Sequence, residues 1–143
     1  MTIRTGGYWL STALVALAFA LGGVMDLLGG PQVAASLQHL GYPAYLAGLL
    51  GFWKLLGALA LLAPRMPLLK EWAYAGMFFD LTGAAYSHAQ SGDPAANVLT
   101  PLVLVGLLAA SWALRPATRM LPRATRADSD PLLAPGELSS AQG

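Results

Sequence analysis

Residues 45–89 read YLAGLLGFWKLLGALALLAPRMPLLKEWAYAGMFFDLTGAAYSHA. Two apolar runs, Tyr45 to Ala63 and Trp72 to Ala89, are joined by a short segment in which Pro64 and Pro67 break the helical pattern. About 20 mostly apolar residues are enough to cross the roughly 30 Å hydrocarbon core of a bilayer as a helix. This stretch therefore predicts an antiparallel pair of membrane-spanning helices.

Two further apolar runs, Tyr8 to Leu28 and Ala95 to Leu114, extend the pattern on either side. The chain is 56% hydrophobic and only 10% charged, whereas about 25% of the residues of a soluble domain are charged. We therefore expect an all-α integral membrane protein, a four-helix bundle over residues 1–115. The Pro-rich remainder, residues 116–143, is predicted to be a disordered cytoplasmic tail.

The first apolar run has an alternative interpretation as a cleaved signal peptide. Arg4 precedes it, and Ala18-Phe19-Ala20 resembles a cleavage site with small residues. Against this, the apolar run continues past Ala20 to Met25. We therefore favour a retained first helix.

The basic residues indicate how the chain is oriented. With four crossings, every Lys and Arg except Lys54 falls on one side of the membrane: Arg4, Arg65, Lys70, Arg115, Arg119, Arg123 and Arg126. The positive-inside rule then makes both termini of this multi-pass membrane protein cytoplasmic. The four arginines after the fourth apolar run either act as a topology signal alone or also contact anionic lipid headgroups. No nucleic-acid-binding motif accompanies these arginines, so no nucleic-acid partner is predicted.

The connecting segments carry two smaller predictions. Residues 32–41 have the spacing of a short helix along the outer surface. Glu71, at the start of the third helix, is placed to pair with Arg65 in the inner turn.

Lys54 and Asp80 interrupt their apolar runs near the middle, so both are expected close to the centre of the bilayer. Ionisable residues at this depth are costly, and they usually face a partner, a protein interior or a water-filled cavity. We expect Lys54 and Asp80 to face each other. The pair either ties two helices together without a ligand or forms part of a binding site.

Asp26 and His88 lie farther outward on their helices and form a second expected layer. In a pocket opening outward, they would exchange protons near neutral pH, and Lys54 would hold an anionic or carbonyl group. His39 and Tyr86 would stand near the pocket mouth. No residue is assigned a catalytic role, and no metal site is predicted.

Several motifs in this part of the chain resemble the DoxX-like family of small four-helix bacterial membrane proteins, over about residues 10–115. They are KLLG from Lys54, PRMPLLKEWAYAG from Pro64, FDLTGA from Phe79, and the later S-H and G-D pairs. The resemblance implies membrane redox work, such as electron transfer from thiosulfate to quinone or an oxidant-resistance complex. The chain has no cysteine, so a quinone or a partner enzyme would have to supply the electron chemistry.

Three functional hypotheses follow. The resemblance suggests a membrane subunit of redox or quinone metabolism, with quinone as the only cofactor it implies and a membrane or peripheral redox protein as its partner. The titratable layers suggest a protein that binds or transports a small solute or protons. The small size and lack of cofactor motifs suggest a membrane scaffold for other proteins. The sequence does not decide whether the chain is an enzyme or how many copies assemble.

Overall fold

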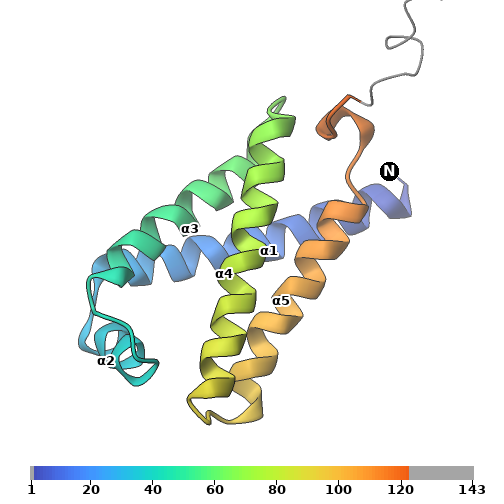
Figure 1. Ribbon diagram of the computed structural model, residues 1–143. Coiled ribbons are helices and arrows are strands. Elements are labelled where there is room, and N and C mark those ends of the chain that lie inside the picture. The colour runs from blue at the N-terminus through green and yellow to red at the C-terminus, as the bar shows by residue number, and fades with distance from the viewer. Residues whose placement is uncertain (1, 123–143) are drawn as a thin grey trace, which may run out of the picture.

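The computed structural model describes residues 2–122, and these form helices and connecting loops with no strand (Figure 1). The elements are α1 (Ile3–Leu28), α2 (Pro31–His39), α3 (Leu46–Leu62), α4 (Pro67–Gln90), α5 (Ala95–Ala113) and the 3-10 turn η1 (Ala117–Arg119). The all-α prediction and the short helix predicted within residues 32–41 are confirmed. Most of the predicted tail, including Arg123 and Arg126, lies outside the described residues.

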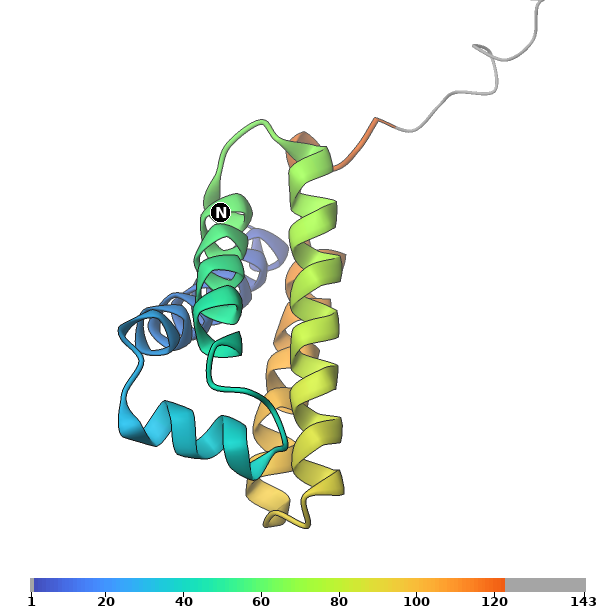
Figure 2. The same cartoon turned by 60° about the vertical axis from the view of Figure 1, so that its left-hand side comes forward.

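Helices α1 and α3 pack side by side through two glycines (Figure 2). A Cβ atom added to Gly51 would lie 2.7 Å from the carbonyl oxygen of Gly23 and 2.9 Å from the backbone nitrogen of Leu27. A Cβ atom on Gly23 would in turn lie 3.0 Å from the carbonyl oxygen of Gly51. Only glycine at both positions allows the two backbones to approach this closely.

Helices α4 and α5 form a second pair, joined by a turn that contains Gly92 in a left-handed conformation (φ +71°). Helix α1 also packs against α5, and a buried apolar core lies between the two pairs. The core includes Val15, Phe19, Leu61, Met77 and Leu108. Helix α2 connects the far end of α1 to α3 and lies at the same end of the molecule as the α4–α5 turn (Figures 1 and 2).

A buried chain of three hydroxyl groups crosses this core. The Ser111 Oγ atom lies 2.6 Å from Thr12 Oγ1 and 2.7 Å from the hydroxyl oxygen of Tyr74. These hydrogen bonds join α1, α4 and α5, and all three side chains are buried. They satisfy polar groups that would otherwise be costly in an apolar interior.

Ser111→Ala is expected to lower the free energy of unfolding by about 2 kcal/mol, because two buried hydroxyl groups each lose a partner. Titration with a denaturing detergent, followed by circular dichroism, measures the change. Thr82→Ala is the matched control, because the exposed Thr82 hydroxyl bonds only to carbonyl groups of its own helix. Equal stability of the two variants would contradict a stabilising role for the hydroxyl chain.

Basic side chains lie at the end of the molecule opposite α2 and bond to groups at the helix ends. Lys70 is fully buried, and its Nζ atom donates hydrogen bonds to the carbonyl oxygens of Ala60 and Leu61, 2.9 and 2.6 Å away. These carbonyls belong to the last turn of α3, which has no helical N–H partners for them. A cation at this negative end of the helix dipole is also favourable.

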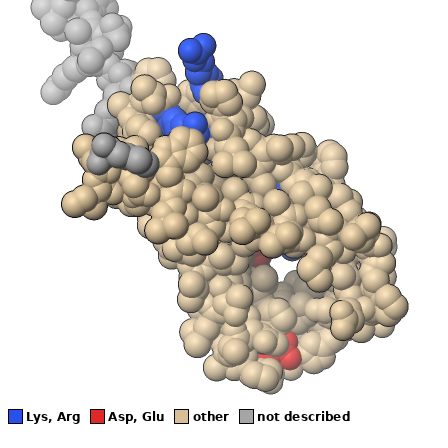
Figure 3. Space-filling view, turned by 180° about the vertical axis from the view of Figure 1, so that it is seen from behind, with Lys and Arg blue, Asp and Glu red and all other residues tan. Residues whose placement is uncertain are grey.

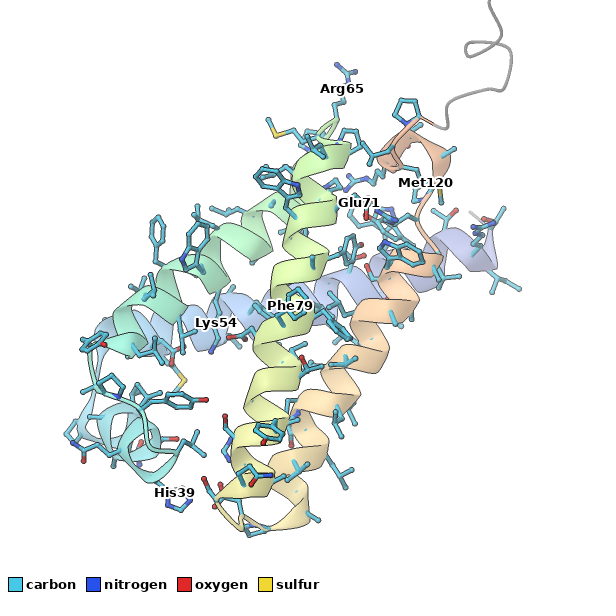
Figure 4. The ribbon with its side chains drawn as sticks, viewed as in Figure 1. His39, Lys54, Arg65, Glu71, Phe79 and Met120 are labelled. Carbon is cyan, nitrogen blue, oxygen red and sulfur yellow. The ribbon has the colours of Figure 1, made fainter. Side chains whose placement is uncertain are left out.

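Glu71 pairs with Arg115, so the predicted pairing of Glu71 with Arg65 was wrong. The Glu71 carboxylate also accepts a hydrogen bond from the indole nitrogen of Trp112 at 3.1 Å. Arg65 lies in the α3–α4 turn and points away from the protein (Figure 4). Helices α4 and α5 pack against each other, and this places Arg115, just after the end of α5, within reach of Glu71 near the start of α4.

The outer surface of the helices is apolar. Large exposed side chains occur on each of the four long helices, among them Leu21, Leu59, Phe79 and Val103. Helices α1 and α5 are each long and apolar enough to cross a membrane, and α3 is a shorter apolar helix. Such a surface is typical of a protein in contact with lipid.

Candidate functional site

Lys54 on α3 forms an ion pair with Asp26 on α1. Its Nζ atom lies 2.8 Å from Asp26 Oδ2, and the two side chains are 23% and 19% exposed. The predicted pairing of Lys54 with Asp80 was therefore wrong. The glycine contact between α1 and α3 brings these two helices closest together, and this selects Asp26 as the partner.

Asp80 nevertheless lies beside Lys54, because both residues line the same two cavities. Within residues 2–122, the Asp80 side chain has no hydrogen bond or ion pair. No fully buried side-chain oxygen or nitrogen in this part of the chain lacks a partner. The carboxylate oxygens of Asp80 must therefore be accessible from the cavity space.

The first cavity, which we call the α3–α4 cavity, has a volume of about 580 Å³. Its wall is mostly apolar and aromatic, with contributions from Phe19, Trp53, Trp72 and Met77. Lys54 and Asp80 supply its charged groups. Lys54 projects from α3 into the space between α3 and α4 (Figure 4).

The second cavity, of about 520 Å³, lies beneath α2, and we call it the α2 cavity. Its lining is more polar and includes Asp26, Gln32, Ser36, Tyr42, Ser87 and His88. Leu50, Lys54 and Asp80 line both cavities, so the two spaces meet at the charged residues. A space-filling view shows a deep opening in the molecule with acidic side-chain atoms at its edges (Figure 3).

Two histidines converge on Asp93, in the α4–α5 turn. His39 Nε2 lies 2.6 Å from Asp93 Oδ1, and His88 Nδ1 lies 2.6 Å from Asp93 Oδ2. Both hydrogen bonds hold the pKa of the Asp93 carboxyl below its ordinary value, and the bond from His88 has the larger effect. We call this cluster the α2 latch, because it attaches the end of α2 to the α4–α5 turn.

The predicted outer layer is thus partly rearranged. His88 and Asp26 both line the α2 cavity, but His88 bonds to Asp93 and Asp26 bonds to Lys54. Tyr86 is 66% exposed, and neither Tyr86 nor His39, the two residues expected near the pocket mouth, lines either cavity.

Tyr42 takes the place that Tyr86 was expected to fill. It lines the α2 cavity, and its hydroxyl oxygen lies 2.8 Å from Ser87 Oγ. Sequence reasoning assigned no site role to Tyr42, Ser87 or Asp93. The S-H and G-D pairs of the family motif, which contain Ser87 and Asp93, were the available signal.

Asp93→Asn is expected to loosen α2, giving faster hydrogen exchange of the backbone amides of residues 31–39 at neutral pH. His39→Gln should have a similar effect on α2 while leaving the His88 contact in place. Unchanged exchange of α2 in both variants would contradict the latch.

The latch also predicts a pH dependence. A group whose pKa is lowered by folding stabilises the folded state above its ordinary pKa, here 3.8, and this contribution is lost as the pH falls through the lowered pKa. The stability difference between the wild type and Asp93→Asn should therefore be present at neutral pH and disappear in acid below pH 3.8. Thermal unfolding at several pH values measures it.

Residues 10–111 match the DoxX-like family, which confirms the resemblance noted in the sequence. The chain belongs to this family and is a DoxX-like membrane protein. The match covers Lys54, Asp26, Asp80 and the α2 latch. No curated protein matched the chain. No solved structure matched it either.

Proposed function

We propose that the chain is a four-pass protein of the bacterial inner membrane, with α1, α3, α4 and α5 as its spans and both ends in the cytoplasm. The apolar exterior and the lengths of α1 and α5 support the spans. Arg65 and the segment near Met120 lie at one end of the molecule, and His39 lies at the other (Figure 4). The positive-inside rule assigns the basic end to the cytoplasm.

Reporter fusions test this topology. Green fluorescent protein fused to the C-terminus should fluoresce. Alkaline phosphatase fused there should be inactive, because alkaline phosphatase folds to its active form only outside the cytoplasm. The opposite result would overturn the proposed orientation.

The function that the geometry supports best is binding of a lipid-soluble small molecule in the α3–α4 cavity. The single observation that carries this proposal is an apolar and aromatic cavity with charged groups at one end, Lys54 and Asp80. Ligand sites in proteins typically combine a mostly apolar wall with a few polar groups that orient the ligand. Small-solute binding was one of the hypotheses from the sequence, and the α3–α4 cavity supports it.

Filling the cavity tests the proposal. Gly76 lines the α3–α4 cavity, and a Cβ atom there would meet nothing within 4 Å. Gly76→Leu should therefore occupy the space without disturbing the helices, and the purified variant should lose small molecules that native mass spectrometry detects on the wild type. Gly48→Leu is the matched control, because Gly48 is equally open but lines neither cavity. Identical bound compounds in all three proteins would overturn the proposal.

A second candidate function is that of a membrane subunit in redox or quinone metabolism. Family membership favours it, and a quinone ring fits an apolar cavity in which Lys54 has further N–H groups to donate to a carbonyl oxygen. The electrons would come from a partner enzyme. A quinone absorbance that is present in the organic extract of the purified wild type and absent from that of Gly76→Leu would support this candidate function. A wild-type extract without quinone would count against it.

A further inference from the structure

The charges that meet between the two cavities do not cancel. Lys54 is paired with Asp26, and this pair is neutral overall. Asp80 adds a further carboxylate, with no partner in the described residues. When Asp80 is ionised, the group of three therefore carries one net negative charge.

No neighbouring side chain among residues 2–122 supplies the missing positive charge. Among the described residues that line the α2 cavity, Lys54 and His88 are the ones whose side chains can carry a positive charge. Lys54 is paired with Asp26, and His88 directs its Nδ1 atom to Asp93. In the α3–α4 cavity, the charged residues of this part of the chain are Lys54 and Asp80 themselves. An ionised carboxylate at membrane depth is costly unless it is paired, so Asp80 requires either a proton or an external cation.

We propose that the α3–α4 cavity binds a hydrophobic cation, whose charge lies against Asp80 and whose apolar body fills the cavity. This inference rests on the proposed ligand-binding function and names the chemical class of the ligand.

The cavity suits both parts of such a molecule. Trp53, Trp72 and Phe19 provide aromatic surface for an apolar body, and aromatic faces also attract cations. The volume of about 580 Å³ is within the range of sites for drug-sized ligands. Asp80 stands where the α3–α4 cavity meets the α2 cavity, so a proton arriving from the α2 cavity would compete with the cation.

Tetraphenylphosphonium is a suitable probe because its charge does not depend on pH, and triphenylphosphine oxide is a similar aromatic molecule without net charge. Equilibrium dialysis against the full chain in lipid nanodiscs, corrected with empty nanodiscs, measures both affinities. The wild type is expected to bind the cation about tenfold more tightly than Asp80→Asn does, because one charge pair is lost. Binding of the neutral compound should be the same in both proteins.

Two further variants test whether the charge of Asp80 itself governs cation binding. Asp93→Asn also removes a carboxylate, but Asp93 lines neither cavity, so cation affinity should be unchanged. The double variant Lys54→Met with Asp26→Leu removes a neutral pair and leaves Asp80, so it should still bind the cation. In the wild type, affinity for the cation should fall as the pH is lowered and Asp80 takes up a proton.

The outcomes distinguish this inference from the function on which it rests. Equal cation affinity in the wild type and Asp80→Asn would overturn the inference. If the wild type binds only the neutral compound, the cavity remains a ligand site but not for a cation. Binding of neither compound would count against the cavity as a ligand site for molecules of this class.

Discussion

Gly51→Ala is expected to lower the free energy of unfolding by about 2 kcal/mol, since inserting a methyl group into a closely packed contact forces the backbone to shift. The new Cβ atom would lie 2.7 Å from the Gly23 carbonyl oxygen and 2.9 Å from the Leu27 backbone nitrogen. Neither is the end of a flexible side chain, so α1 and α3 must move apart. The same movement would separate Asp26 from Lys54, because each belongs to one of these two helices.

Gly48→Ala is the matched control for this variant. Gly48 lies on the same helix, and a Cβ atom there meets nothing within 4 Å. Alanine is the better helix former, so this control should raise the free energy of unfolding by about 0.5 kcal/mol. Detergent denaturation of both variants, followed by tryptophan fluorescence, measures the difference. Equal effects at the two positions would show that α1 and α3 do not meet through Gly51.

The helices were predictable because membrane-length apolar runs and helix breakers are local signals. Pro64 and Pro67 frame the turn between α3 and α4, and Pro94 immediately precedes α5. These features depend on the residues within each segment and not on how the segments pack.

The ion-pair partner of Lys54 was not predictable in the same way. Depth along the helices placed Lys54 and Asp80 at the same level, but depth does not determine which helices touch. The contact between Gly23 and Gly51 decides this, and it places Asp26 against Lys54. The glycines were visible in the sequence, but their pairing across two helices was not.

The α2 latch depended on a loop geometry that helical spacing does not describe. Asp93 lies in the α4–α5 turn, beyond the helical face that carries His88. His39 ends α2, and only the docking of α2 against this turn brings it to the same carboxylate. Residues in loops follow the packing of the elements that they join, so their contacts could not be derived from sequence periodicity.

Lys54→Met is expected to lower the free energy of unfolding by about 3 kcal/mol, because it leaves the Asp26 carboxylate unpaired in a largely buried place. Asp26→Leu should cost less, about 2 kcal/mol, because Asp80 still lies beside the Lys54 cation. The double variant should recover most of that loss, since a buried ion pair exchanged for apolar residues is often close to neutral. Detergent denaturation of all four proteins completes a double-mutant cycle, and the expected coupling energy is about 2 kcal/mol or more.

A second cycle, with Asp80→Leu in place of Asp26→Leu, tests whether the pairing is specific. Asp80 makes no ion pair in the described residues, so combining its replacement with Lys54→Met should restore much less stability. A larger recovery with Asp80→Leu than with Asp26→Leu would show that Lys54 pairs with Asp80 in the membrane. That result would also move the unpaired carboxylate from Asp80 to Asp26, which lines the α2 cavity and not the α3–α4 cavity, and so would contradict cation binding in the α3–α4 cavity.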